Sequence, residues 1–198
     1  MQDTCRRALG ATEEQEHVID ALLVLARSQA GVQAREPVDL AELADAWAAG
    51  GRPAAAGIEL AADLQPAPVR GDRRLLERLV ANLLENAVGH NLPDRGWIRL
   101  ETGCADGHSV LRITNPGALI AADQVPELFE PFRRLTGERT ATGGLGLGLS
   151  IVRAIATAHG GQVIAVGRKE GGLEVGVHLP AAHPAAAHGA ERARAVAG

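Results

Sequence analysis

The chain has 198 residues, of which 46% are hydrophobic, and its formal net charge is −4 at pH 7. That length suits one ordinary domain with an appendage, and the mixed charges, without a basic arm, argue against nucleic-acid binding. Cys5 and Cys104 have no C-x-x-C partner, which favours incidental cysteines in a reducing, cytoplasmic setting over a redox or metal centre. The chain shows neither a signal peptide nor an apolar run of about eighteen residues, so we expect no membrane contact by this segment.

The first segment, residues 3 to 34, is expected to form one long helix. Its apolar positions recur at alternating spacings of four and three residues and form two adjacent seams. Two seams predict a helix that touches more than one neighbour, as in a bundle. A helix that packs only on its own domain is the alternative.

A break, a second helix and two strands are expected next. Pro37 ends the long helix, and Asp39 is the expected N-cap of a helix that stops at Gly50-Gly51. Residues 58–64 and a short stretch around Val69 have the composition of strands.

Residues 77–91, ERLVANLLENAVGHN, predict an amphipathic helix that Asp72 can cap. Asn82 and Asn86 are one turn apart, so their carboxamides project from one face. Amides beside a buried apolar stripe need polar partners. Nearby backbone groups are one such partner, and a Mg²⁺–phosphate group is the other, because carboxamide oxygens are hard ligands.

The second half of the chain combines four strands with a long irregular segment. Residues 97–102 and 109–114 predict adjacent antiparallel strands, and residues 162–166 and 173–179 predict a hairpin that closes the sheet. Between the two pairs, residues 115–144 are poorly periodic and punctuated by Pro and Gly. A long segment of this kind in a compact domain is expected to form a lid.

A glycine-rich turn follows this segment and leads directly into a helix that ends at Gly160-Gly161. Gly144, Gly146 and Gly148 place bare backbone at the helix N-terminus, where unpaired N–H groups and the helix dipole favour a phosphate. The pattern is neither a P-loop nor a dinucleotide fingerprint. Glycine-rich turns before helices are common, so the order of the motifs matters more than this one alone.

Four motifs in order resemble the N, G1, F and G2 boxes of sensor histidine kinases, over roughly residues 40 to 180. They are Asn82–Asn86, Asn115-Pro-Gly117, Phe129-Glu-Pro-Phe132 and Gly144 to Leu149. The wider superfamily also includes type II topoisomerases, mismatch-repair ATPases and heat-shock chaperones. The resemblance implies an α+β fold of the Bergerat type, a two-layer α/β sandwich in which helices cover one face of a mixed, mostly antiparallel sheet.

The resemblance also divides the chain into three parts. Residues 1–34 resemble the second helix of the family's dimerisation and histidine-phosphotransfer hairpin, which is incomplete here. Residues 35–180 resemble the ATP-binding catalytic domain. Residues 181–198 are Ala-rich and lack a core pattern, so we expect a disordered tail.

ATP and Mg²⁺ are the cofactors that the resemblance implies. Asn86 would coordinate Mg²⁺, and Asn82 would help to hold the metal and the phosphates. The glycine-rich turn would surround the phosphates through Gly144, Gly146, Leu147, Gly148 and Leu149.

The adenine end of the site would be formed by residues of the G1 box and the end of the Asn-bearing helix. Asn115 stands where the family usually has an Asp that accepts from the adenine amino group; its amide oxygen can still accept that bond, without charge assistance. Gly117 would let the backbone pass close to the base, whereas Leu119 replaces a second glycine. His90 stands where an aromatic residue commonly packs on the nucleotide, and a capping or surface role is the alternative. Gly89 replaces a basic residue that often precedes that position.

The lid would contribute aromatic and basic residues. Phe129 and Phe132 fit a hinge or latch that docks on the core in one lid state, and plain anchoring in the core is the alternative. Arg134 would reach the γ-phosphate, where a positive group stabilises the transferring phosphoryl oxygens. Arg133 and Arg139 are the alternatives to Arg134.

The residue at position 82 indicates whether the site transfers the phosphoryl group of ATP or hydrolyses ATP. The hydrolytic relatives usually carry a Glu there as a base, and Asn82 cannot remove a proton. Glu85 would point away from the asparagine face, because successive helix residues are rotated by about 100°. ATP should therefore be held for transfer rather than hydrolysed quickly.

The family's phosphoacceptor histidine, which is followed by an acidic residue and then Arg-Thr-Pro, is absent. None of the seven histidines has that context: His17, His90, His108, His159, His178, His183 and His188. We therefore expect a fragment or truncated reading frame that binds ATP but does not phosphorylate itself in the usual way.

The resemblance implies the ATP–Mg²⁺-binding catalytic part of a two-component sensor histidine kinase, which donates the γ-phosphoryl group to a histidine on a helix missing from this chain. Its partners would be that helix of the parent kinase, a response regulator, and a second copy through the N-terminal helix. The parent protein would be anchored in the inner or plasma membrane, with this part in the cytoplasm. An anti-sigma-type serine kinase and a catalytically weak interaction module are the alternatives.

Overall fold

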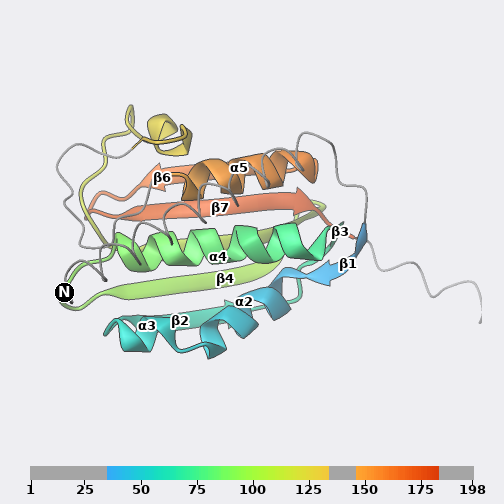
Figure 1. The fold of residues 1–198 in the computed structure, drawn as a ribbon, viewed down its shortest axis with the longest axis horizontal. Coiled ribbons are helices and arrows are strands. Elements are labelled where there is room, and N and C mark those ends of the chain that lie inside the picture. The colour runs from blue at the N-terminus through green and yellow to red at the C-terminus, as the bar shows by residue number, and fades with distance from the viewer. Residues whose placement is uncertain (1–34, 134–145, 183–198) are drawn as a thin grey trace, which may run out of the picture.

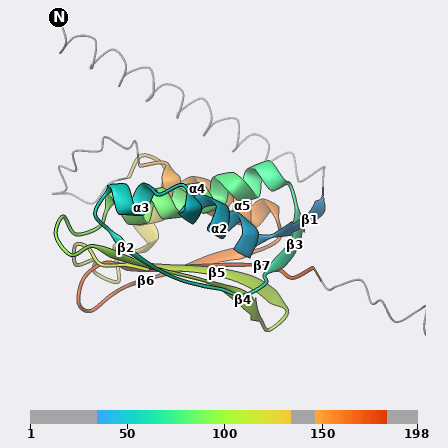
Figure 2. The same cartoon turned by 90° about the horizontal axis from the view of Figure 1, so that it is seen from below.

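The computed structural model describes residues 35–133 and 146–182, which form two layers. A five-stranded sheet carries the described helices on one face, and no described helix covers the opposite face (Figures 1 and 2). The elements are β1 (Glu36–Asp39), α2 (Leu40–Ala49), α3 (Arg52–Ala55), β2 (Glu59–Leu64), β3 (Pro68–Gly71), α4 (Arg73–Gly89), β4 (Trp97–Ala105), β5 (His108–Asn115), the 3-10 helix η1 (Pro126–Phe129), α5 (Gly148–Ala158), β6 (Gln162–Gly167) and β7 (Leu173–Pro180).

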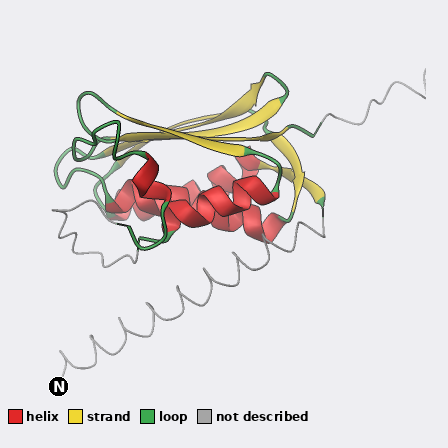
Figure 3. Cartoon of the chain, turned by 90° about the horizontal axis from the view of Figure 1, so that it is seen from above, coloured by secondary structure: helices red, strands yellow, loops and turns green. Residues whose placement is uncertain are grey.

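The sheet is mixed but mostly antiparallel. Its strand order is β2-β4-β5-β7-β6, and only the β2–β4 pair is parallel. Alternate residues of the strands face the helices and build the core, whereas their neighbours face the open side. The predicted two-layer α+β fold is therefore confirmed, with helices and sheet in separate layers (Figure 3).

Within the described residues, the predicted strands and the three predicted helices are confirmed to within four residues at their ends, and three short elements were missed. The missed elements are β1, α3 and η1. Pro37 was taken only as a helix breaker, yet β1 pairs antiparallel with β3 and joins Val38 to Val69, and both valines are buried. The partner strand lies far away in sequence, so local pattern carries no sign of the pairing.

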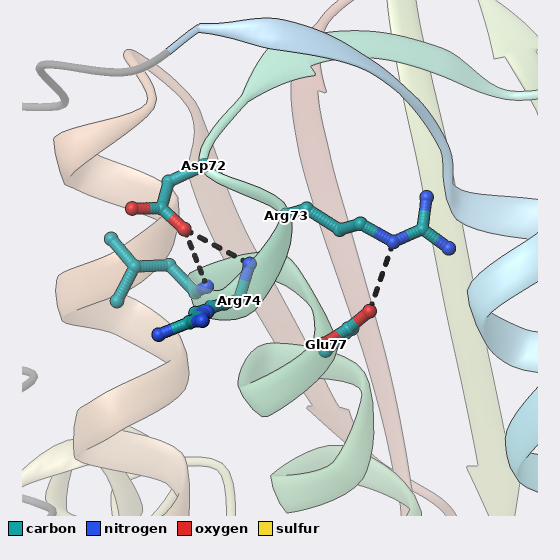
Figure 4. Close-up of polar contacts among 5 residues, drawn as sticks. Asp72, Arg73, Arg74 and Glu77 are labelled. Carbon is teal, nitrogen blue, oxygen red and sulfur yellow. Dashed lines mark hydrogen bonds and ion pairs between the residues drawn. The ribbon is translucent and has the colours of Figure 1, made fainter.

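Both long helices on the α2–α4 side begin at an aspartate cap. The Asp72 carboxylate accepts from the backbone N–H groups of Arg74 (2.9 Å) and Leu75 (3.2 Å) (Figure 4). Asp39 accepts from Ala41 N–H on its own helix and from Ala67 N–H of the neighbouring loop, both at 2.9 Å. Each cap contributes about 1 kcal/mol, and the predictions of both caps are confirmed.

The core lies between the helices and the inner face of the sheet. Leu76, Leu79 and Leu83 of α4 are almost fully buried, as are Leu100 of β4 and Leu111 of β5. Burying one such side chain is worth about 1.5–3 kcal/mol relative to leaving it exposed. Among the described helices, none is both long and apolar enough to cross a membrane.

The end of the domain corrects the predicted boundary of the tail by two residues. Ala181 bridges Val69, and Ala182 N–H donates to the carbonyl of Pro68 at 2.8 Å. Residues 183–198 lie outside the described part of the chain, as does the long helix predicted for residues 3 to 34.

His159, the residue that ends α5, is buried and connects two elements. Its Nδ1 lies 2.8 Å from the carbonyl of Ile155, and its Nε2 lies 3.2 Å from the backbone N–H of Asp72. A carbonyl only accepts and a backbone N–H only donates, so Nδ1 carries the proton and Nε2 accepts. The neutral ring is therefore satisfied at both nitrogens.

Burial lowers the pKa of His159 below its ordinary value of 6.5, because the charged ring is poorly solvated there. The hydrogen bond to Ile155 opposes this effect, nearby Arg35 adds to it, and Asp72 opposes it. The unfolded chain consequently binds more protons than the folded chain below the ordinary pKa. The contribution of the neutral His159 ring to the free energy of unfolding is therefore fully present above the ordinary pKa, and it is lost as the pH falls below that pKa.

We predict that the folded domain is less stable at about pH 5 than at about pH 8, and that His159→Gln removes part of this dependence because glutamine does not titrate. Chemical denaturation of both proteins at a series of pH values measures the effect. The difference between their free energies of unfolding should shrink as the pH falls. A difference that stays constant across the series would contradict the role assigned to His159.

Candidate functional site

Three parts of the fold meet where the sequence motifs predict a site. The C-terminal half of α4, the beginning of α5 and the end of β5 lie together on the helix side of the sheet. α4 and α5 run antiparallel side by side (Figure 1), with Gly148 beside Asn82 and His159 beside Asp72. Motifs from distant parts of the chain are thereby brought to one place.

Asn82 is buried, with 8% of its surface exposed, and its carboxamide is oriented. Its Nδ2 donates to the carbonyl of Arg78 at 2.8 Å, so one end of the amide has a backbone partner. Its Oδ1 has no donor among the described residues and faces Gly148. A Cβ added at Gly148 would lie 3.5 Å from this oxygen. The amide nitrogen of Asn82 therefore has the backbone partner that the structural alternative predicted, whereas its oxygen faces the glycine turn.

Asn86 is half-buried one turn further along α4. Its side chain makes no hydrogen bond to any part of the chain that the structure describes. The neighbouring Glu85 is directed elsewhere, because it pairs with Arg52 of α3 at 2.6 Å. Glu85 is therefore occupied away from the asparagines, as the helix geometry predicted.

The glycine turn leaves the N-terminus of α5 without a side-chain cap. Leu147 occupies the N-cap position, in contrast to the aspartates that cap α2 and α4. The side chains of Leu147 and Leu149 are buried in the core, so only backbone N–H groups face outward at this helix end. Gly146 has a φ of 70° and a Cβ there would lie 2.6 Å from the carbonyl oxygen of Arg133, so the turn requires glycine.

The two phenylalanines have different surroundings. Phe129 is buried against α5, with the Arg153 guanidinium 5.8 Å from its ring centre. Phe132 is 63% exposed, and its backbone N–H donates to the carbonyl of Gly146 at 3.1 Å. Phe129 is thus a core anchor, whereas Phe132 reaches the glycine turn through its backbone.

Asn115, at the end of β5, is also buried and oriented by the backbone. Its Nδ2 donates to the carbonyl of Pro116 at 2.9 Å, a bond that an aspartate carboxylate cannot make. No donor among the described residues reaches its Oδ1. The free end of the amide is therefore an acceptor.

Gly117 lies against the C-terminal end of α4. A Cβ there would lie 2.5 Å from the carbonyl oxygen of His90, so only glycine fits. Sequence reasoning missed the other side of this contact, the turn between β6 and β7, where a Cβ on Gly171 would lie 2.5 Å from the Gly117 carbonyl oxygen. The Gly-Gly pair between two strands was the available signal. Leu119, which replaces a glycine of the family pattern, is 73% exposed and obstructs nothing.

The predicted basic and metal-binding groups are only partly within the described residues. Arg133 is paired with Glu127 and Glu130, both at 3.1 Å, and is not directed at the glycine turn. Arg134, Arg139 and Gly144 lie outside the residues that the structure describes. Within residues 35–133 and 146–182, no cluster of three His, Cys, Asp or Glu side chains could hold a metal ion.

Comparison with known proteins agrees with this arrangement. The family model described as "Histidine kinase-, DNA gyrase B-, and HSP90-like ATPase" matches residues 71–183, which is more than half of the chain. The sensor protein CutS of Streptomyces coelicolor is 42% identical over 183 residues, which cover 91% of this chain and 44% of CutS. The chain thus spans less than half the length of this relative.

Two solved structures are similar in fold. The mycobacterial sensor histidine kinase MprB superposes with a TM-score of 0.65 at 31% identity, covering 75% of this chain and 98% of that chain. Full-length ShkA in complex with AMPPNP superposes with a TM-score of 0.71 at 27% identity, covering 91% of this chain and 39% of that chain. The chain therefore belongs to the histidine kinase-, DNA gyrase B- and HSP90-like ATPase family, as the catalytic ATP-binding domain of a two-component sensor histidine kinase.

Proposed function

We propose that this domain holds Mg²⁺–ATP between α4 and the start of α5, and donates the γ-phosphoryl group to a histidine on another helix. One observation carries the proposal: the Asn82 oxygen faces the uncapped N-terminus of α5 across Gly148. Unpaired backbone N–H groups and the positive end of the helix dipole attract phosphate. Carboxamide oxygens on the facing helix supply neutral ligands for a hard cation.

The donor set fits a magnesium ion that is bound together with phosphates. Asn86 would hold the ion and Asn82 would assist, with phosphate oxygens and water completing the coordination that Mg²⁺ prefers. When bound, the ion would neutralise charge that develops on the phosphoryl oxygens. A neutral asparagine pair without a neighbouring free carboxylate supports transfer over hydrolysis, because Glu85 is paired with Arg52.

The adenine end of the proposed site rests on Asn115. Its Oδ1 is the acceptor suited to an exocyclic amino group, while its Nδ2 is held by Pro116. Guanine presents a carbonyl oxygen at the corresponding position, which an acceptor repels. Adenine should therefore be preferred for as long as the amide keeps this orientation.

Three of the four described histidines are placed where they do not suit a phosphoacceptor, and the fourth, His90, directly follows α4 at the proposed nucleotide site. His159 is buried with both ring nitrogens bonded, so it cannot act as a nucleophile. His108 and His178 lie on strands that pair in the sheet, and their side chains are on the open face, away from the helices. The transfer would take place with a phosphoacceptor helix of the parent kinase, followed by a response regulator, in the cytoplasm beneath a membrane-anchored parent.

Residues 1–34 would supply the second helix of the phosphotransfer hairpin and residues 35–182 the catalytic domain. The lid residues Arg134 and Gly144 would complete the phosphate site. This assignment and the roles of the site residues are part of the proposal. The chain by itself would not autophosphorylate.

We predict that Asn86→Ala removes the Mg²⁺-dependent part of ATP affinity, a loss of at least about tenfold, because a metal ligand is deleted. Titration calorimetry with ATP in the presence and absence of Mg²⁺ measures it. Glu85→Ala is the matched control, since this exposed neighbour pairs with Arg52 and should leave affinity unchanged. Equal affinity of Asn86→Ala and the wild type would contradict the metal assignment, and no ATP binding by the wild type would favour the interaction module.

We predict that the domain binds ATP at least about fivefold more tightly than GTP, because a base that leaves the buried Asn115 oxygen unsatisfied costs about 1–3 kcal/mol. Competition of each nucleotide against a fluorescent ATP analogue measures the ratio. Asn115→Ala should weaken ATP and leave GTP little changed. Equal binding of the two nucleotides to the wild type would show that the amide turns to suit either base.

We predict that a phosphoacceptor helix hairpin of a related sensor kinase, added in trans with Mg²⁺–ATP, becomes phosphorylated on histidine. Phosphohistidine is acid-labile and stable to base, whereas phosphoserine has the opposite behaviour. Radiolabelled ATP with acid and base treatment separates the two. Phosphate that survives acid would favour the serine kinase, and the chain incubated alone should remain unlabelled.

A further inference from the structure

We propose that His159 is a positioning residue for the nucleotide site. It lies at the opposite end of the α4–α5 pair, and through α5 it fixes the position of the glycine turn relative to Asn82. The proposal rests on the proposed function, since it concerns the same site. His159 touches neither the asparagines nor the glycine turn, and it acts through α5. Its two ring contacts are the reason for the assignment.

The two helices form an antiparallel pair with a close approach at one end and a hydrogen bond at the other. At one end, Gly148 faces the Asn82 oxygen; at the other, His159 bonds the backbone N–H of Asp72, the N-cap of α4. Asp72 and Asn82 are separated by about 15 Å along α4, and Gly148 and His159 by about 16 Å along α5, at about 1.5 Å per residue. A shift of α5 along α4 near His159 would therefore also move Gly148 relative to Asn82.

The imidazole ring is suited to fix this shift because it is bonded on both sides. Nδ1 donates to Ile155 on its own helix, so the ring cannot rotate freely, and Nε2 then accepts from Asp72 at 3.2 Å. The apolar contacts between α4 and α5 are non-directional and tolerate sliding far better than a hydrogen bond does. The ring thus supplies the directional contact at this end of the helix pair.

Gly71 provides a second, independent observation. It lies in β3, next to Asp72, and a Cβ there would lie 2.5 Å from Cδ2 and 2.6 Å from Nε2 of His159. Its backbone conformation is one that any residue can adopt, so the requirement for glycine comes mainly from the ring, with Leu76 Cδ1 a further 3.0 Å neighbour of the added Cβ. The absence of a Cβ at Gly71 in β3 therefore leaves room for the His159 ring to reach the backbone N–H of Asp72.

Two substitutions separate the two ring contacts. In His159→Gln, the amide oxygen can take the place of Nε2 and accept from Asp72, which keeps the contact between the helices. In His159→Asn, the shorter amide can donate to Ile155 but cannot reach Asp72. Gly71→Ala leaves the histidine in the chain and displaces its ring.

The experiment measures ATP affinity of these variants by calorimetry, well below each protein's Tm. His159→Gln should stay near the wild type, whereas His159→Asn and Gly71→Ala should bind about tenfold more weakly, since small misplacement of binding groups is costly. Asp39→Ala is the control for stability, because it removes the N-cap of α2, which packs on α4 but takes no part in either ring contact of His159. It should lower the Tm and leave ATP affinity unchanged.

Wild-type affinity in both His159→Asn and Gly71→Ala would overturn the proposal. If His159→Asn does not fold, Gly71→Ala decides alone. If the wild type itself binds no ATP, the proposed function fails. The position of the glycine turn relative to Asn82 is then measured without nucleotide, from the NMR resonance of the Asn82 side-chain amide. That resonance should shift in Gly71→Ala and remain in place in Asp39→Ala; an unshifted resonance would overturn the inference.

Discussion

The antiparallel packing of α4 on α5 is the constraint on which the remainder of the structure depends. Both helices bury an apolar face on the same side of one sheet, and the polar side chain of Asn82 lies where the two helices meet. Asn82 meets Gly148 in this seam, so an amide oxygen and an uncapped helix end face one another. Neither group has a protein partner among the described residues, and this observation supports the proposal that an anionic ligand binds here together with a cation.

The surrounding elements hold this seam in place by close backbone contacts. Gly117 presses against the carbonyl of His90 at the end of α4, and the β6–β7 turn presses in turn against Gly117. Side chains would separate these segments, so glycine is required for contact rather than for flexibility. The base end of the site is consequently built from packed backbone, with the Asn115 amide oriented by Pro116.

In the proposed function, the catalytic domain is separate from the histidine that it would phosphorylate. The described histidines are either buried and doubly bonded, on the open face of the sheet, or at the end of α4. A carboxylate that could serve as a hydrolytic base is also absent from the asparagine face within the described residues, since Glu85 pairs with Arg52. Both features suit a site that holds ATP until a separate acceptor approaches.

Local features of the sequence determined much of this protein. The two strand pairs β4–β5 and β6–β7, the aspartate caps at Asp39 and Asp72, and the shared face of Asn82 and Asn86 depend on residues close together in the chain, so period and capping chemistry predict them. The order of the four motifs along the chain indicated the family. Only the tertiary structure decided the contacts between distant segments: the pairing of β1 with β3, the ion pair of Glu85, and the bond from His159 to Asp72. These contacts join residues 29 to 87 positions apart, and hydrogen-bond partners at such separations are chosen by packing rather than by local propensity.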